Sequence, residues 1–145
     1  MFGVDYEIKR VNSGNVACFK YRCPIVSTTN DDQSKLFIRM DYERLTKQVL
    51  KDNNSGKLRV ILTGKGGIGK SKLLIYLAME ICKLNVNCKI MYSDSRSAII
   101  FTRNGVVEAL GPDSATNLMQ QLSGEDFWLM DGAEHGPWTQ FPGHI

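Results

Sequence analysis

The chain has 145 residues, of which 43% are hydrophobic and 23% are charged. These fractions are typical of one globular domain and exclude a chain that is disordered throughout. The net charge of +3 is too small to indicate nucleic-acid binding by itself, but it is unevenly distributed. Residues 1–72 hold 14 Lys and Arg against 7 Asp and Glu, whereas residues 73–145 hold 4 against 8. The basic half is typical either of a surface that contacts an acidic partner or of an ordinary solvated face.

Neither the cysteines nor the apolar runs indicate a metal site, secretion or a membrane. Cys18, Cys23, Cys82 and Cys88 and the two histidines lack the spacing of a zinc site or a disulfide framework. No apolar run is long enough to span a bilayer, and no leader typical of secretion opens the chain. We therefore expect an intracellular protein, cytoplasmic or nuclear, with free thiols and no contact with a membrane.

The amino-terminal residues predict a β-hairpin. Residues 6–11 alternate polar and apolar side chains, residues 12–15 are typical of a turn, and residues 16–23 form a second strand. The polar stretch 27–32 has the composition of a linker. It separates the hairpin from the rest of the chain.

A helix is predicted next. After an apolar patch at Phe37 and Ile38, hydrophobic residues recur at helical spacing from Met40 to residue 51. Polar residues then end the helix, and an apolar strand at 58–62 leads into a glycine-rich loop.

Residues 64–71 read Gly-Lys-Gly-Gly-Ile-Gly-Lys-Ser and match the phosphate-binding pattern G-x-x-x-x-G-K-[ST], the Walker A motif. Glycines leave no Cβ to block a phosphate chain from the backbone N–H groups, and the following helix directs its positive end at the anion. Lys70 would contact the β- and γ-phosphates, and the Ser71 hydroxyl would bind Mg²⁺. The alternative is a glycine-rich turn with a chance lysine. The predicted nucleotide-binding residues are Gly64, Lys65, Gly66, Gly67, Ile68, Gly69, Lys70 and Ser71.

Strands and helices alternate after the loop. A strong helix covers residues 72–82, and short strands are predicted at 88–92, 98–101 and 127–131. A modest helix is predicted around Leu118 and Leu122. This alternation predicts an α/β fold with a parallel sheet.

Asp131 follows an apolar strand, as the Mg²⁺-binding aspartate of a Walker B strand does. The alternative is a core strand that ends in an Asp-Gly turn. Hydrolysis would also need a group that orients water. Glu134 is the nearest acidic candidate and His135 its neighbour, although a surface turn explains both, and Asp94 is a further candidate. Arginine fingers are not singled out by the sequence.

The residues from 36 to about 135 resemble Crinkler-type and retrotransposon hot spot proteins. The resemblance rests on the apolar–Arg–x–x–Tyr segment Leu36–Tyr42, on the loop and its Leu- and Tyr-rich helix, and on Asp131-Gly132. Those families usually have Thr-Pro where this loop has Lys65-Gly66. The resemblance implies an ATPase-type module of larger proteins.

Other families share only the loop. Its string is that of the nitrogenase iron protein, and Lys65 resembles the signature lysine of partition-type ATPases. In those proteins the loop lies near the amino terminus and the Walker B strand follows much later, whereas here Asp131 follows Ser71 by 60 positions. The NB-ARC and NACHT switch ATPases have a similar string and larger helical modules.

We therefore predict a P-loop NTPase-type fold, a parallel sheet flanked by helices, with a β-hairpin extension over 1–34 and the core over 35–145. We expect this core to be incomplete, because 14 residues follow Asp131 and show no further strand pattern. The expected ligands are ATP and Mg²⁺. Lys70 and Glu134 are the candidate catalytic residues, and Ser71 and Asp131 the metal ligands. Hydrolysis, a nucleotide-dependent switch or interaction module, and a fragment without turnover stay open as outputs. Partner proteins or domains are expected, and nucleic acid has weaker support.

Overall fold

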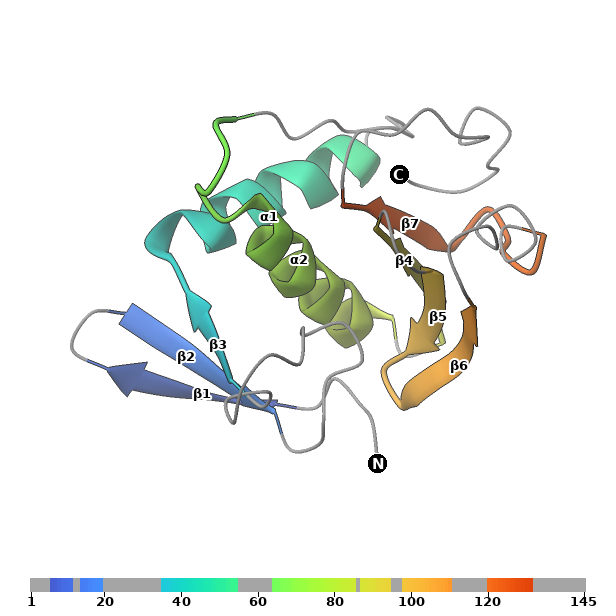
Figure 1. Cartoon of the computed structure of the whole chain (residues 1–145), viewed down its shortest axis with the longest axis horizontal. Coiled ribbons are helices and arrows are strands. Elements are labelled where there is room, and N and C mark those ends of the chain that lie inside the picture. Colours follow the sequence, from blue (N-terminus) through green and yellow to red (C-terminus); the bar gives the residue numbers. More distant parts are fainter. Residues whose placement is uncertain are drawn as a thin grey trace.

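A computed structural model describes residues 6–11, 14–19, 35–54, 64–85, 87–94, 98–110 and 120–131. These residues form two helices and seven strands in two sheets, an α/β arrangement (Figure 1). The coarse prediction of an α/β fold is therefore confirmed. The predicted strand at 58–62 lies outside the described residues, as do Glu134 and His135.

The amino-terminal sheet is antiparallel and has the order β1-β2-β3. Strand β1 (Tyr6–Val11) pairs with β2 (Gly14–Phe19), which confirms the predicted hairpin. Strand β3 (Lys35–Ile38) adds to the other edge of β2. The sequence does not predict this third strand, because Phe37 and Ile38 form a short apolar patch that adjoins the helical pattern. Residues 20–23 of the predicted second strand are outside the described part.

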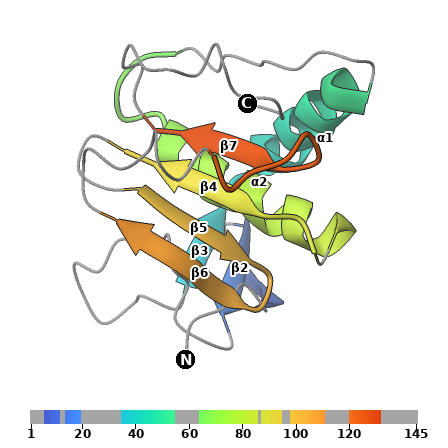
Figure 2. The same cartoon turned by 90° about the vertical axis from the view of Figure 1, so that its right-hand side faces the viewer.

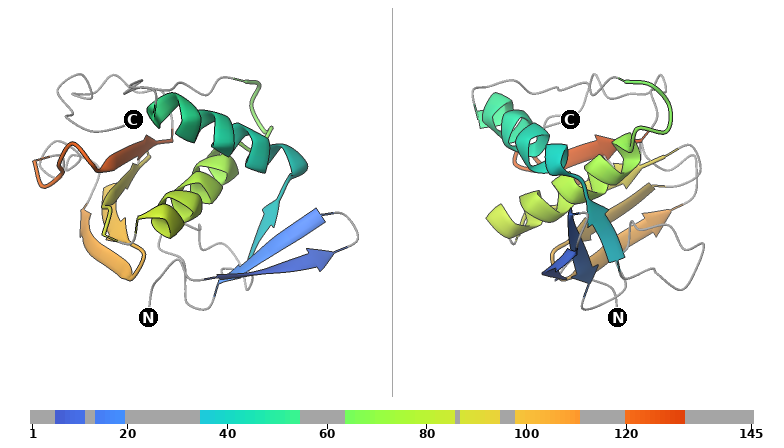
Figure 3. Two further views of the ribbon diagram at one scale, coloured as in Figure 1. Left: turned by 180° about the vertical axis from the view of Figure 1, so that it is seen from behind. Right: turned by 90° about the vertical axis from the view of Figure 1, so that its left-hand side faces the viewer.

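Two helices follow in chain order. Helix α1 (Met40–Asn54) begins with acidic residues and ends with a basic one, which suits the helix dipole, and it buries one face. Helix α2 (Lys70–Leu84) confirms the strong helix that was predicted behind the loop. Almost every residue from Leu73 to Cys82 is buried, because α2 lies between the two sheets (Figure 3). It is the central element of the core.

The second sheet has the order β6-β5-β4-β7, and its strands are β4 (Ile90–Ser93), β5 (Ala98–Thr102), β6 (Gly105–Leu110) and β7 (Phe127–Met130) (Figure 2). Only β4 and β7 are parallel; β4 with β5 and β5 with β6 are antiparallel. The prediction of a parallel sheet is wrong for β5, which pairs antiparallel with both of its neighbours. The four residues 94–97 are too few for a parallel crossover, which needs a dozen or more. Strand β6 was not predicted.

Strands β4, β5 and β7 bury residues on both faces of the second sheet. Ile90, Phe101 and Leu129 face the helices and share one hydrophobic cluster with Ala17 and Leu36 of the amino-terminal sheet. Met91, Ala98, Ile100, Leu122 and Trp128 form a second cluster. The alternation follows the two-residue period of a strand. The two sheets are thus joined through α2 in one core.

The last two predictions concern a helix near residue 120 and the lack of a membrane-spanning segment. The modest helix around Leu118 and Leu122 lies partly outside the described residues, and residues 120–121 form a turn. No helix in the described ranges is long and apolar enough to cross a membrane.

Candidate functional site

The glycine-rich loop runs from Gly64 into the first turn of α2 with its residues largely exposed. Gly69 precedes the helix with φ 94° and ψ 24°, and Gly67 has φ 76°. Both angles lie in the left-handed region that side chains with a Cβ rarely adopt, so these two positions favour glycine. The loop therefore depends on its glycines for its path as well as for open space.

Lys70 is the first residue of α2, and its side chain folds back across the loop. Its Nζ donates hydrogen bonds to the carbonyl oxygens of Gly64 at 2.8 Å and Lys65 at 2.7 Å. An ammonium group has three donors and can exchange such carbonyl partners for phosphate oxygens. The lysine is thus held over the loop by two of its carbonyl groups.

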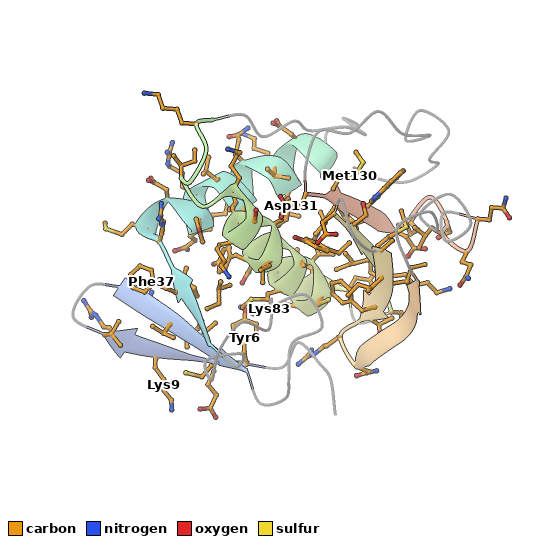
Figure 4. The ribbon with its side chains drawn as sticks, in the orientation of Figure 1. Tyr6, Lys9, Phe37, Lys83, Met130 and Asp131 are labelled. Carbon is orange, nitrogen blue, oxygen red and sulfur yellow. The ribbon has the colours of Figure 1, made fainter. Side chains whose placement is uncertain are left out.

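Ser71 and Asp131 meet although 60 positions separate them. The Ser71 Oγ donates to Asp131 Oδ1 at 3.0 Å, and the Tyr92 hydroxyl donates to Asp131 Oδ2 at 2.9 Å. The backbone N–H of Asp131 donates to the Ser93 carbonyl at 2.8 Å, which extends the parallel pairing of β4 and β7. Figure 4 shows Asp131 at the end of β7 beside α2. Both carboxylate oxygens are therefore oriented by side chains from other elements.

Tyr92 was not predicted as part of the site. Burial raises the pKa of its hydroxyl first of all, and the hydrogen bond and charge of Asp131, then the charge of Asp94, add to this. The group stays a protonated donor at neutral pH. The only signal in the sequence is its place near the end of a strand that precedes a Walker B-like strand, which does not single out its hydroxyl.

Two residues at the start of α1 contact the loop: Arg39 directly precedes the helix, and Tyr42 lies in its first turn. Arg39 Nη1 donates to the Ile68 carbonyl at 2.7 Å, and the Tyr42 hydroxyl donates to the Gly69 carbonyl at 3.0 Å. The sequence marked Arg39 and Tyr42 only as part of a family resemblance, without a role. Their contacts place them beside the loop.

Positive charge gathers at the amino end of α2. Lys70 and Lys72 lie in its first turn, which contains no acidic residue, and Gly69 provides no side-chain cap. Arg39 contacts the loop next to them. Cations are unfavourable at a helix amino terminus, where the backbone N–H groups are already positive. This arrangement suits a bound anion.

The described residues contain no group of three or more His, Cys, Asp or Glu side chains that could hold a metal ion by themselves. Ser71 and Asp131 instead supply two oxygen donors next to the loop. Mg²⁺ is commonly held by one or two carboxylates together with waters and substrate phosphates. The donor set therefore fits Mg²⁺ that arrives with a phosphate ligand.

The fold and the site together define an α/β protein with a cationic glycine-rich loop at the amino end of a buried helix. Comparisons with protein families, with characterised proteins and with solved structures find no match to the chain. Its function must therefore be inferred from the chemistry of its own residues.

Proposed function

We propose that the chain is a P-loop NTPase-type domain that binds ATP with Mg²⁺ through residues 64–71. The observation that carries the proposal is the hydrogen bond between Ser71 Oγ and Asp131 Oδ1 beside the glycine-rich loop. The sequence motif requires a hydroxyl and a distant carboxylate at one place for a metal–phosphate complex. The resemblance to Crinkler-type proteins belongs to the same proposal.

Each residue has a separate task in this proposal. Lys70 binds phosphate oxygens in place of the loop carbonyls that it now contacts. The loop N–H groups surround the phosphates, and Ser71 and Asp131 hold Mg²⁺, with Tyr92 keeping the carboxylate oriented. Bound Mg²⁺ supplies charge neutralisation at the phosphates.

The proposal extends to binding and leaves turnover to experiment. Hydrolysis needs a residue that orients the attacking water, and the candidate Glu134 lies outside the described residues. A domain that binds without hydrolysing acts as a nucleotide-dependent switch or interaction module. The two outputs differ in whether phosphate is released.

Calorimetric titration of the full chain with ATP, with and without Mg²⁺, tests the proposal. We expect Lys70→Ala to abolish measurable binding, and Ser71→Ala and Asp131→Asn to remove the Mg²⁺ dependence. Lys47→Ala is the matched control, because Lys47 carries the same charge on an exposed face of α1 and pairs with Glu43 at 2.7 Å. ATP that fails to bind folded protein, or binds Lys70→Ala as well as the unmodified chain, contradicts the proposal. Phosphate release that depends on Lys70 identifies an ATPase.

A further inference from the structure

We propose that Arg39 and Tyr42 are positioning residues that orient the peptide N–H groups of Gly69 and Lys70 toward bound phosphate. The proposal rests on the proposed function of the loop. Its observation is that two side chains from one turn of backbone donate to two consecutive loop carbonyls, those of Ile68 and Gly69.

Peptide geometry connects those carbonyls to the N–H groups. The carbonyl of Ile68 belongs to the same peptide unit as the N–H of Gly69, and the carbonyl of Gly69 to that of Lys70. A trans peptide is planar and its C=O and N–H point in opposite directions, and no cis peptide occurs among the described residues. A donor that holds each carbonyl on one side of the loop therefore directs each N–H to the other side.

The Gly69 carbonyl makes this direction definite. It accepts the helical hydrogen bond from the Leu73 N–H at 2.9 Å in addition to the bond from Tyr42. The carbonyl thus points along α2 toward its carboxyl end, and the N–H of Lys70 points out of the amino end. This is the direction in which helix termini bind anions.

Packing holds the Tyr42 side chain in place, and a backbone hydrogen bond joins the exposed Arg39 to it. The Tyr42 side chain is buried, and its ring lies 6.0 Å from the ring of Tyr76. Burial raises the pKa of Tyr42, so its hydroxyl remains a donor at neutral pH. The Tyr42 N–H also donates to the Arg39 carbonyl at 3.1 Å, which joins the two residues in one turn.

The close approach of this turn also explains the glycine at position 69. A Cβ placed on Gly69 would lie 2.7 Å from Tyr42 Oη and 3.4 Å from Arg39 Cζ. Arg39 contacts the Ile68 carbonyl at 2.7 Å, so its guanidinium places a full positive charge next to the peptide unit of Ile68 and Gly69. A charged donor polarises that peptide and strengthens its N–H as a donor to an anion.

Arg39→Met and Tyr42→Phe remove the donors and keep most of the side-chain volume. We expect affinity for inorganic triphosphate, a probe that lacks the base and sugar of ATP, to fall about tenfold for Arg39→Met and about threefold for Tyr42→Phe. Arg39→Lys retains one donor to Ile68 and should recover part of the loss. The ¹⁵N shifts of the Gly69 and Lys70 amides, whose peptide units contain the two carbonyls, should change in the free variants.

Two matched controls separate positioning from a general loss of structure. Arg44→Met removes the same charge from the exposed face of α1, where Arg44 contacts Asp41 at 3.4 Å. Tyr76→Phe removes a hydroxyl from the same aromatic pair; no hydrogen bond from that hydroxyl is seen among the described residues. We expect both to bind triphosphate as the unmodified chain does. The unfolding midpoint in urea confirms for each variant that folded protein is titrated.

The outcomes are distinguishable. If Lys70→Ala abolishes binding but Arg39→Met and Tyr42→Phe bind triphosphate normally with unchanged amide shifts, this proposal is overturned and the proposed function stands. A loss of stability without a change in affinity likewise reduces Arg39 and Tyr42 to structural contacts. Failure of the unmodified chain to bind triphosphate overturns both.

Discussion

The two ends of α2 follow opposite rules. At the carboxyl end, Lys83 suits the helix dipole, pairs with Glu80 at 2.9 Å and lies over the ring of Tyr6 at 4.7 Å (Figure 4). The Tyr6 hydroxyl donates to Glu80 at 3.0 Å, and the N–H of Asn85 caps the Ile81 carbonyl. At the amino end, lysines stand where acidic residues are favoured, and no side chain caps the helix.

We interpret this difference as a division between contacts that stabilise the fold and the anion binding that we propose. At the carboxyl end, Tyr6 of the amino-terminal sheet and Glu80 and Lys83 of α2 interact with one another and so join the sheet to the helix. At the amino end, Lys70 and Lys72 lie in a first turn without acidic residues, which the helix dipole disfavours, and the phosphate ligand that we propose would offset this cost. Such a local conflict with the rules of folding is expected at a functional site. The comparison predicts that substitutions at the amino end affect ligand binding, and that substitutions at the carboxyl end affect stability alone.

Gly69→Ala should have the largest effect. The left-handed φ of 94° costs a residue with a Cβ about 1–2 kcal/mol, and the Cβ would also displace the Tyr42 hydroxyl. We expect the free energy of unfolding to fall by about 2 kcal/mol and ATP binding to be lost. Urea unfolding and calorimetric titration measure the two quantities.

Gly66→Ala is the control for that substitution. Gly66 does not have a positive φ, and a Cβ there would meet nothing within 4 Å. We expect its stability to stay within about 0.5 kcal/mol of the unmodified chain. Equal destabilisation by both alanines would show that the path of the loop does not depend on the left-handed conformation of Gly69.

Lys72→Glu tests the conflict at the amino end directly. A carboxylate in the first turn interacts favourably with the helix dipole, so stability should rise by about 0.3–1 kcal/mol. The same charge repels a polyphosphate, so ATP affinity should fall severalfold at low salt and less at high salt. Lys83→Gln at the other end of α2 is the control and should leave affinity unchanged. If Lys72→Glu raised or lowered both the stability and the ATP affinity, the proposed conflict between them at the amino end of α2 would be contradicted.

The sequence predicted the part of the site whose chemistry is local. Lys70 and Ser71 follow from the loop motif, and Asp131 from an apolar strand, and the structure brings Ser71 and Asp131 together. Arg39, Tyr42 and Tyr92 could not be assigned, because their bonds cross 29, 27 and 39 positions and depend on how the elements pack.

For the fold as well, contacts between distant elements could not be predicted from the sequence, except for the pairing of β4 with β5. Hydrophobic period alone predicted both long helices and strands β4, β5 and β7, but it carries no information on strand direction. The antiparallel pairing of β4 and β5 could have been predicted from their connection of four residues, which is too short for a crossover. Strand β6 was missed because Gly105 and Glu108 interrupt its apolar pattern.

Tyr6→Phe should have the smallest effect, and only on stability. It removes the bond to Glu80, which still pairs with Lys83, so the free energy of unfolding should fall by about 1 kcal/mol at pH 7 with ATP affinity unchanged. Burial, and then the charge and hydrogen bond of Glu80, raise the pKa of Tyr6 above its ordinary value of 10.0. A raised pKa in the folded state stabilises the chain below pH 10.0, and this contribution is lost as the pH rises further. Burial also raises the pKa of Tyr76, to about 12, which adds to the alkaline loss in both proteins. Urea unfolding between pH 7 and pH 11 should therefore show a shallower decline above pH 10 for Tyr6→Phe than for the unmodified chain. Parallel declines would mean that Tyr6 titrates alike in the folded and unfolded states, and that its hydrogen bond to Glu80 does not stabilise the carboxyl end of α2.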